Sequence, residues 1–130
     1  MSITTARKPE PLHVDFKDGI TVEGYVAVQA TTGLTALAGG GQTGATALPS
    51  SYNVISTCAT NGDSVLLPAI PQDGSSIAVW VKNNGSANAA VFPQSGASIN
   101  ALSANASLTV NAAAKQLFVS VGLTNWQSFV

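Results

Sequence analysis

The most constraining feature of this sequence is a series of short β-type runs that recurs at intervals of about eight to twelve residues. Turn-forming stretches such as NGD, PQDG, NNGS and SGAS separate several of the runs, and no amphipathic helix of useful length lies between them. The pattern predicts an all-β fold, a jelly-roll-like sandwich or barrel of short antiparallel strands. The runs are residues 51–59, 64–70, 76–82, 88–93, 106–112, 115–122 and 125–130.

The chain has 130 residues, enough for one domain that buries roughly two-thirds of its extended-chain surface. Pro9 and Pro11 disfavour helix at the residues before them, so residues 1–11 are expected to form an extended N-terminal arm. Residues 12–130 are expected to form a single β-domain. Within it, the small, uncharged and glycine-rich residues 30–50 are predicted to be a loop or an interface-ordered segment.

Two hairpins are predicted. A three-residue loop, Lys17-Asp18-Gly19, pairs Phe16 with Ile20 and Val14 with Val22, which places the apolar side chains on one face.

The second hairpin turns at Asn84-Gly85 and joins the runs 76–82 and 88–93. Trp80 and Ala78 lie on one of its faces, and neither face is polar. A sheet of an isolated β-sandwich normally exposes a polar face to solvent. Because neither face is polar here, we expect one face to pack against the second sheet. The other face, with Ala78 and Trp80, is expected to meet a neighbouring subunit or the N-terminal segment.

Charge is scarce and excludes several classes of partner. Charged residues make up 8% of the chain, the net charge is −1, and no charge occurs between Gly24 and Gly62. The absence of a basic patch argues against nucleic-acid binding, and no run approaches the ~20 apolar residues that span a bilayer. The N-terminus lacks the apolar stretch of a signal peptide, and the single Cys58 is expected to be a buried thiol in a protein of a reducing compartment.

No catalytic, metal or cofactor site is expected. His13 is the only histidine and is predicted to pair with Glu23 across the first hairpin. The stretch GDSVLL around Ser64 is superficially similar to a serine-esterase block, but that chemistry needs a downstream histidine. Asp63 and Asp73 stand beside glycines in predicted turns, where aspartate bonds the local backbone. We therefore expect a protein that is not an enzyme.

One alternative stays open among the aromatic residues. Trp126 with Tyr52 would form an exposed platform for a glycan, whereas alternation within the strands favours core or interface positions for most rings.

Residues from about Ala45 to Trp126, about two-thirds of the chain, resemble a small β-module of tailed-bacteriophage virion proteins. The resemblance lies in three stretches, ALPSSYNVISTCATNGDSVLLPA, IAVWVKNNGSANAAVFPQSGASINAL and LFVSVGLTNWQS. They contain a Gly-Asp before a strand that ends in Leu-Pro, a V-x-V-x-N-x-G hairpin, an F-P-x-x-G-x-x-I-N turn and a terminal tryptophan. The module is similar to that of capsid decoration (cement) proteins and of some head-fibre or tail-fibre parts.

The resemblance implies a non-enzymatic virion structural protein, made in the host bacterial cytoplasm, that decorates and stabilises the outer capsid surface as a homodimer or homotrimer. Its partners would be the major capsid protein and further copies of itself. A carbohydrate-binding module of a tail fibre or spike is the alternative. We expect residues of the arm and of the first hairpin to contact the shell or a sister subunit. We expect residues of the second hairpin to form a subunit interface. These are Arg7, Lys8, Leu12, Val14 and Phe16, with Ala78 and Trp80 at the subunit interface.

Overall fold

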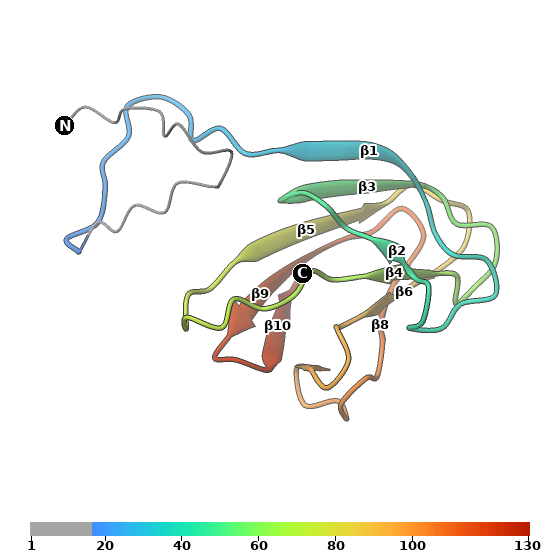
Figure 1. Cartoon of the computed structure of the whole chain (residues 1–130). Helices are drawn as coiled ribbons and strands as arrows, with labels where there is room; N and C mark the ends of the chain where they lie inside the picture. The colour runs from blue at the N-terminus through green and yellow to red at the C-terminus, as the bar shows by residue number, and fades with distance from the viewer. Residues whose placement is uncertain (1–16) are drawn as a thin grey trace, which may run out of the picture.

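The computed structural model describes residues 17–130, which form ten strands in two sheets and no helix (Figure 1). This part of the chain accordingly holds no helix that is long and apolar enough to cross a membrane. The strands are β1 (Ala30–Thr35), β2 (Thr46–Ala47), β3 (Tyr52–Thr57), β4 (Ser64–Leu66), β5 (Ala78–Asn83), β6 (Ala89–Phe92), β7 (Ser98–Ile99), β8 (Leu108–Val110), β9 (Lys115–Val121) and β10 (Asn125–Phe129).

The first six strands alternate between the two sheets. The larger sheet has the order β1-β3-β5-β9-β10-β7, and the smaller sheet has the order β2-β4-β6-β8. β1, β3 and β5 run parallel to one another, as do β2, β4 and β6. The chain therefore winds through three stacked coils, each with one strand in each sheet, which is the path of a β-solenoid.

The C-terminal strands close this coiled part with antiparallel pairs. β8 pairs with β6 in the smaller sheet, while β9 pairs with β5 and β10 with β9 in the larger sheet. β7 lies parallel to β10 at the far edge. Parallel and antiparallel ladders thus occur in both sheets.

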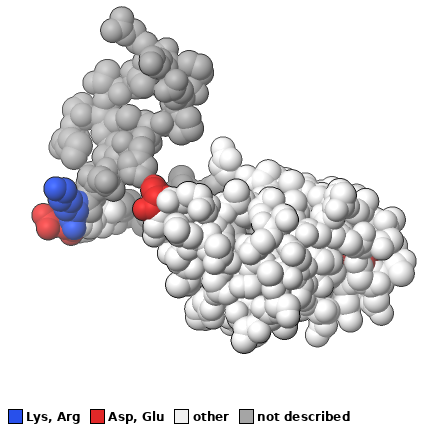
Figure 2. All heavy atoms as spheres, turned by 60° about the horizontal axis from the view of Figure 1, so that its bottom comes forward, with Lys and Arg blue, Asp and Glu red and all other residues white. Residues whose placement is uncertain are grey.

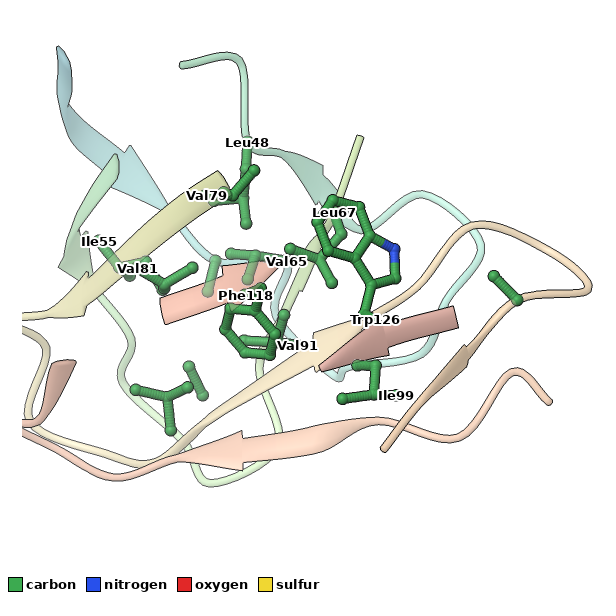
Figure 3. Close-up of a cluster of buried hydrophobic side chains, with 14 of the residues drawn as sticks. Leu48, Ile55, Val65, Leu67, Val79, Val81, Val91, Ile99, Phe118 and Trp126 are labelled. Atoms are coloured by element: carbon green, nitrogen blue, oxygen red, sulfur yellow. The ribbon is translucent and has the colours of Figure 1, made fainter. Parts of the chain in front are cut away.

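The core lies between the two sheets (Figure 3). Phe118 of β9 and Trp126 of β10 are completely buried there, together with Val65 and Val91, which are register partners in the smaller sheet. Alternate residues of each strand point inward, so the remaining side chains of the larger sheet point to its outer surface.

Two buried asparagines bond the backbone of neighbouring segments, Asn83 that of the crossing after β5 and of β8, and Asn53 that of the next coil at Trp80. The Asn83 side-chain amide donates to the carbonyl oxygens of Ala87 (2.9 Å) and Val110 (3.0 Å), and its Oδ1 accepts the Gly85 N–H. The Asn53 amide donates to the carbonyls of Ser50 and Trp80. Because both side-chain amides find backbone partners, the two asparagines are buried without leaving these amides unpaired.

The predicted all-β class is confirmed, and each of the seven predicted runs contains a strand. The predicted antiparallel jelly-roll-like arrangement is wrong for the first six strands, whose ladders are parallel. The turn stretches carry the chain across to the opposite sheet instead of back along the same one. A β-strand pattern and a turn pattern do not distinguish these two paths.

The predicted Asn84-Gly85 hairpin is wrong for the same reason, because β5 and β6 belong to different sheets. The residue before this glycine donates its N–H to the carbonyl of Ile55 in the coil below. A Cβ built on Gly85 would lie 2.5 Å from both the Cβ and the backbone nitrogen of Cys58. Glycine is needed here because the two coils touch at the crossing, not because a tight hairpin turns.

The prediction of a loop or interface-ordered segment over residues 30–50 is wrong for residues 30–35 and 46–47, which form β1 and β2, whereas residues 36–45 between them belong to neither strand. One glycine of this turn allows close stacking on the next coil. Gly40 has φ +72°, and a Cβ on it would lie 2.4 Å from the carbonyl oxygen of Gly62. The Thr31 and Ser50 hydroxyls bond each other at 2.7 Å, so β1 is held to the segment that precedes β3.

Residues 17–29, named here the extension, run away from the two sheets (Figure 1). All of them are exposed, and none lies in a strand. The second half of the predicted first hairpin, at Ile20 and Val22, is therefore not a strand. Its other half, the arm 1–11 and the proposed partner of Glu23, His13, lie outside the described residues.

Candidate interaction surface

The surface that stands out is the outer face of the larger sheet, formed by the outward residues of β3, β5, β9 and β10. Its members share one side of the sheet because they alternate with the buried residues of each strand. They are Tyr52, Val54, Ala78, Trp80, Lys82, Lys115, Leu117, Val119, Val121, Gln127 and Phe129. This set is named the outer face below.

Four large apolar side chains cross the outer face in one line. Tyr52 is the register partner of Trp80, Trp80 of Leu117, and Leu117 of Phe129. Directly opposed residues on neighbouring strands place their side chains side by side. The four residues, named the apolar row, thus form a continuous strip over four strands. Tyr52 is 46% exposed and Phe129 53% exposed, so both ends of the strip face solvent.

The two aromatic rings at one end of the row stack on each other. The ring centroids of Tyr52 and Trp80 lie 6.2 Å apart, and the ring planes differ by 12°. The stack keeps both rings upright on the sheet. The stacking restricts the motion of the two rings, and the apolar row has few groups that can hydrogen-bond to water.

Two lysines border the row. Lys82 and Lys115 are register partners on β5 and β9, so their side chains leave the outer face side by side. They are the only lysines or arginines from residue 30 to residue 130. The Lys82 ammonium donates to the carbonyl oxygen of Ala113. Like charges directly opposite one another destabilise a sheet, so this pair favours a neighbour that brings negative charge.

One hollow adjoins the row, and a second lies near one end of the outer face. One of 190 Å³ lies among Tyr52, Val54, Trp80 and the lysine pair. The other, of 460 Å³, lies where the extension joins the sheet, between Val28, Ser51 and Ala78. The smaller hollow is therefore a recess of the outer face, whereas the larger one lies at the end of the sheet and reaches the core residues Leu48 and Val79.

The structure brings some of the predicted residues to this surface and not others. Ala78 and Trp80, the two residues predicted for a subunit interface, lie on the outer face, and Tyr52 joins them. Trp126 is completely buried between the sheets, so the predicted glycan platform of Tyr52 with Trp126 is wrong. The remaining predicted contact residues, Arg7, Lys8, Leu12, Val14 and Phe16, lie outside the described residues.

The polar residues around the esterase-like stretch bond the backbone. The Ser64 hydroxyl is buried and donates to the carbonyl of Gly41 at 2.7 Å. The Asp63 carboxylate accepts the N–H groups of Gly39, Ala59 and Thr60 at 3.0–3.2 Å. Both side chains thus hold the crossings between coils together.

Cys58 is buried, as predicted. Burial, and secondly the carboxylate of Asp63, raise the pKa of its thiol. Across residues 17–130, no three histidine, cysteine, aspartate or glutamate side chains gather in a way that could hold a metal ion.

Leu117, Phe129 and the two lysines were missed in the sequence. β9 has Leu117, Val119 and Val121 on one side and Phe118 between Gln116 and Ser120 on the other. This pattern does not tell which residues of β3, β5 and β10 stand beside it. Register between strands that are far apart in sequence is set by tertiary packing, which the sequence pattern of one strand does not contain.

Comparisons of the chain with protein-family models, with curated proteins and with solved structures find no significant match.

Proposed function

We propose that this protein is a non-enzymatic structural component of a tailed-bacteriophage virion that decorates and stabilises the outer capsid surface as a homo-oligomer. Its partners are the major capsid protein and further copies of itself. The observation that carries the proposal is the outer face, whose apolar row crosses four strands and is exposed at both ends. Large exposed apolar patches on compact domains commonly mark protein–protein contacts.

Two features of the sequence support the same conclusion. The turn motifs resemble those of phage decoration and head-fibre modules. The near absence of charge from residue 24 to residue 62 leaves a surface of serine, threonine, asparagine and glycine. Such a surface resists self-association poorly in free solution and suits a protein that is covered on several sides in an assembly.

Decoration requires only modest affinity in each copy. Each copy contributes a few kcal/mol, roughly the range of a weak interface, and many copies must detach before a shell opens. Stabilisation of the shell then follows from binding that is specific for the assembled state.

The test is electron microscopy of phage particles produced with and without the chain. The expected result is density of one small β-domain oligomer on the outer capsid surface, which disappears in particles without the chain. Density in the tail only, or no difference between the particles, would contradict the proposal. Deletion of residues 1–11 is expected to abolish binding to the shell while the described β-domain stays folded, because these residues precede it in the chain.

Carbohydrate binding remains the second candidate function, with Trp80 in place of Trp126 beside Tyr52. The Tyr52–Trp80 stack beside the 190 Å³ hollow presents aromatic surface of the kind that sugars stack on. A glycan array with the purified protein tests it. Signals that Tyr52→Ala abolishes would favour this function, and an array without signals would remove it.

A further inference from the structure

The extension and the outer face each carry apolar side chains that their own chain leaves uncovered. In the extension these are Ile20, Val22, Tyr25, Val26 and Val28, which are 45–98% exposed. Five large apolar residues within nine positions are far more than a solvated connector needs. The described body of the same chain does not cover them, so they are open to a partner.

The path of the chain explains why the extension does not cover its own sheet. The Gln29 carbonyl accepts the Tyr52 N–H at 3.1 Å, and Ala30 pairs with Tyr52. The extension therefore leaves the body in line with β1 and continues beyond the sheet (Figure 1). To lie on its own outer face it would have to reverse at Gln29.

The charges of the two surfaces are complementary. The outer face carries Lys82 and Lys115, whereas the extension carries two acids, Asp18 and Glu23, and one lysine, Lys17, so its net charge is −1. In Figure 2 the coloured atoms of both signs gather on the extension, and the visible face of the body is almost entirely white.

Direct stacking of two outer faces lacks such complementarity, because it brings the lysine pairs of two copies together. The body offers only Asp63 and Asp73 as acids, and both bond local backbone groups.

We infer that the extension of one copy, residues 17–29, lies across the outer face of a second copy, with Ile20, Val22 and Val26 against the apolar row and Glu23 beside Lys82 and Lys115. The dimensions allow it. Thirteen extended residues reach about 40 Å at roughly 3.3 Å each, and the row crosses three strand spacings, about 14 Å. The inference names the contact behind the homo-oligomer of the proposed function and rests on that proposal for its biological role.

The first experiment measures association of the purified full-length chain by sedimentation velocity, with no capsid present. The wild type is expected to form an oligomer at micromolar concentration. Ile20→Ser together with Val26→Ser is expected to raise the dissociation constant at least about tenfold, because two branched apolar side chains leave the contact. These residues are exposed in the single chain, so the body keeps its stability. Thr109→Ser, an exposed change on the smaller sheet, is the control.

A charge exchange tests the pairing itself. Lys115→Glu and Glu23→Lys are each expected to weaken association about tenfold, since each places like charges together. The double variant is expected to recover most of the wild-type affinity. Lys115→Glu combined with Thr109→Lys, a lysine outside the contact, is expected to show no recovery.

A crosslink locates the contact. Tyr25→Cys protein mixed with Lys115→Cys protein is expected to give a disulfide-linked dimer of the two variants under mild oxidation, whereas Tyr25→Cys mixed with Thr109→Cys gives none. The native Cys58 is buried and does not interfere.

Three outcomes overturn the inference: a monomeric wild type, an oligomer that the charge exchange leaves unchanged, or a crosslink at Thr109→Cys in place of Lys115→Cys. A monomeric wild type that still binds capsids contradicts this inference alone. An oligomer that passes these tests but is absent from the capsid surface contradicts the proposed function alone.

Discussion

Gly85 lies directly on Cys58, at the point where one coil of the chain crosses over the previous one. A Cβ at position 85 would stand 2.5 Å from the Cys58 Cβ and backbone nitrogen and 2.9 Å from its Cα. Two of these three atoms belong to the backbone, so no rotamer change relieves the contact. The separation between the second and third coils is therefore set by the absence of a side chain at this one residue.

Replacing Gly85 with alanine is expected to lower the free energy of unfolding by about 2–3 kcal/mol, since the coils must move apart. Urea denaturation followed by circular dichroism measures it. Gly74→Ala is the control: Gly74 has φ +86° but no atom near a Cβ, so it costs only backbone strain, about 1 kcal/mol. Equal losses in the two variants would show that the crossing is looser than described.

Asn83→Asp is expected to lower the free energy of unfolding by about 3 kcal/mol. The carboxylate cannot donate to the carbonyls of Ala87 and Val110, and it places a charge at a completely buried position. The neighbouring Asn84 is exposed, so Asn84→Asp is expected to change stability by less than about 0.5 kcal/mol. The same urea titration measures the free energy of unfolding of both variants. Similar losses would contradict a stabilising role of the Asn83 side-chain hydrogen bonds.

The two tryptophans are expected to differ in fluorescence. With Trp80→Phe, the remaining Trp126 is completely buried and should emit at shorter wavelength than an exposed indole and resist quenching by acrylamide. With Trp126→Phe, the emission of Trp80 should be quenched more readily. If Trp126 proved the better quenched of the two, its buried position and the exclusion of a glycan platform there would both fail.

Trp126→Phe should cost little stability for a core substitution. The indole Nε1 is buried without a hydrogen-bond partner among the described residues. Phenylalanine gives up some packing but also removes an unsatisfied N–H, so the expected loss is about 1 kcal/mol. A loss as large as that of Trp126→Ala, about 3–5 kcal/mol, would indicate that the N–H has a partner.

Cys58 is expected to react slowly with a thiol reagent in the folded protein and rapidly in urea, because it is buried and its thiol pKa is raised. A pKa that is raised by folding contributes stability below the ordinary thiol pKa, and this stability is lost as the pH rises through the raised value. The stability difference between the wild type and Cys58→Ala should therefore shrink between about pH 7 and about pH 10. A difference that stays constant or grows would contradict this direction.

The sequence was informative about which residues form strands and poor at which strands meet. The seven apolar runs each contain a strand because alternation and flanking turns are local signals. β1 was missed because its threonines and Gly33 have little apolar character, and it is recruited through parallel pairing with β3. β2 and β7 are two residues long and have no pattern of their own.

For the same reason, the sequence indicated only some of the residues of the outer face. Two apolar faces on residues 76–82 predicted that Trp80 and Ala78 lie together on the face turned away from the second sheet, where they do lie. That Trp80 has Tyr52 on one flank and Leu117 on the other depends on parallel β3–β5 pairing and antiparallel β5–β9 pairing. Trp126 was left open between two roles, since a single aromatic residue in an alternating strand does not reveal which face is covered.

The stacking of β1–β2, β3–β4 and β5–β6 also limits how such a chain can change in length. Each coil adds one strand to each sheet, so after removal of a whole coil the strands on either side of it could still pair. Removal of half a coil would instead leave one sheet a strand short of the other. Insertions and deletions that conserve the fold are therefore expected in whole-coil steps or in the crossings. A gene that encodes this architecture can grow by duplicating a segment of roughly the length between Ala30 and Tyr52 without redesigning either end.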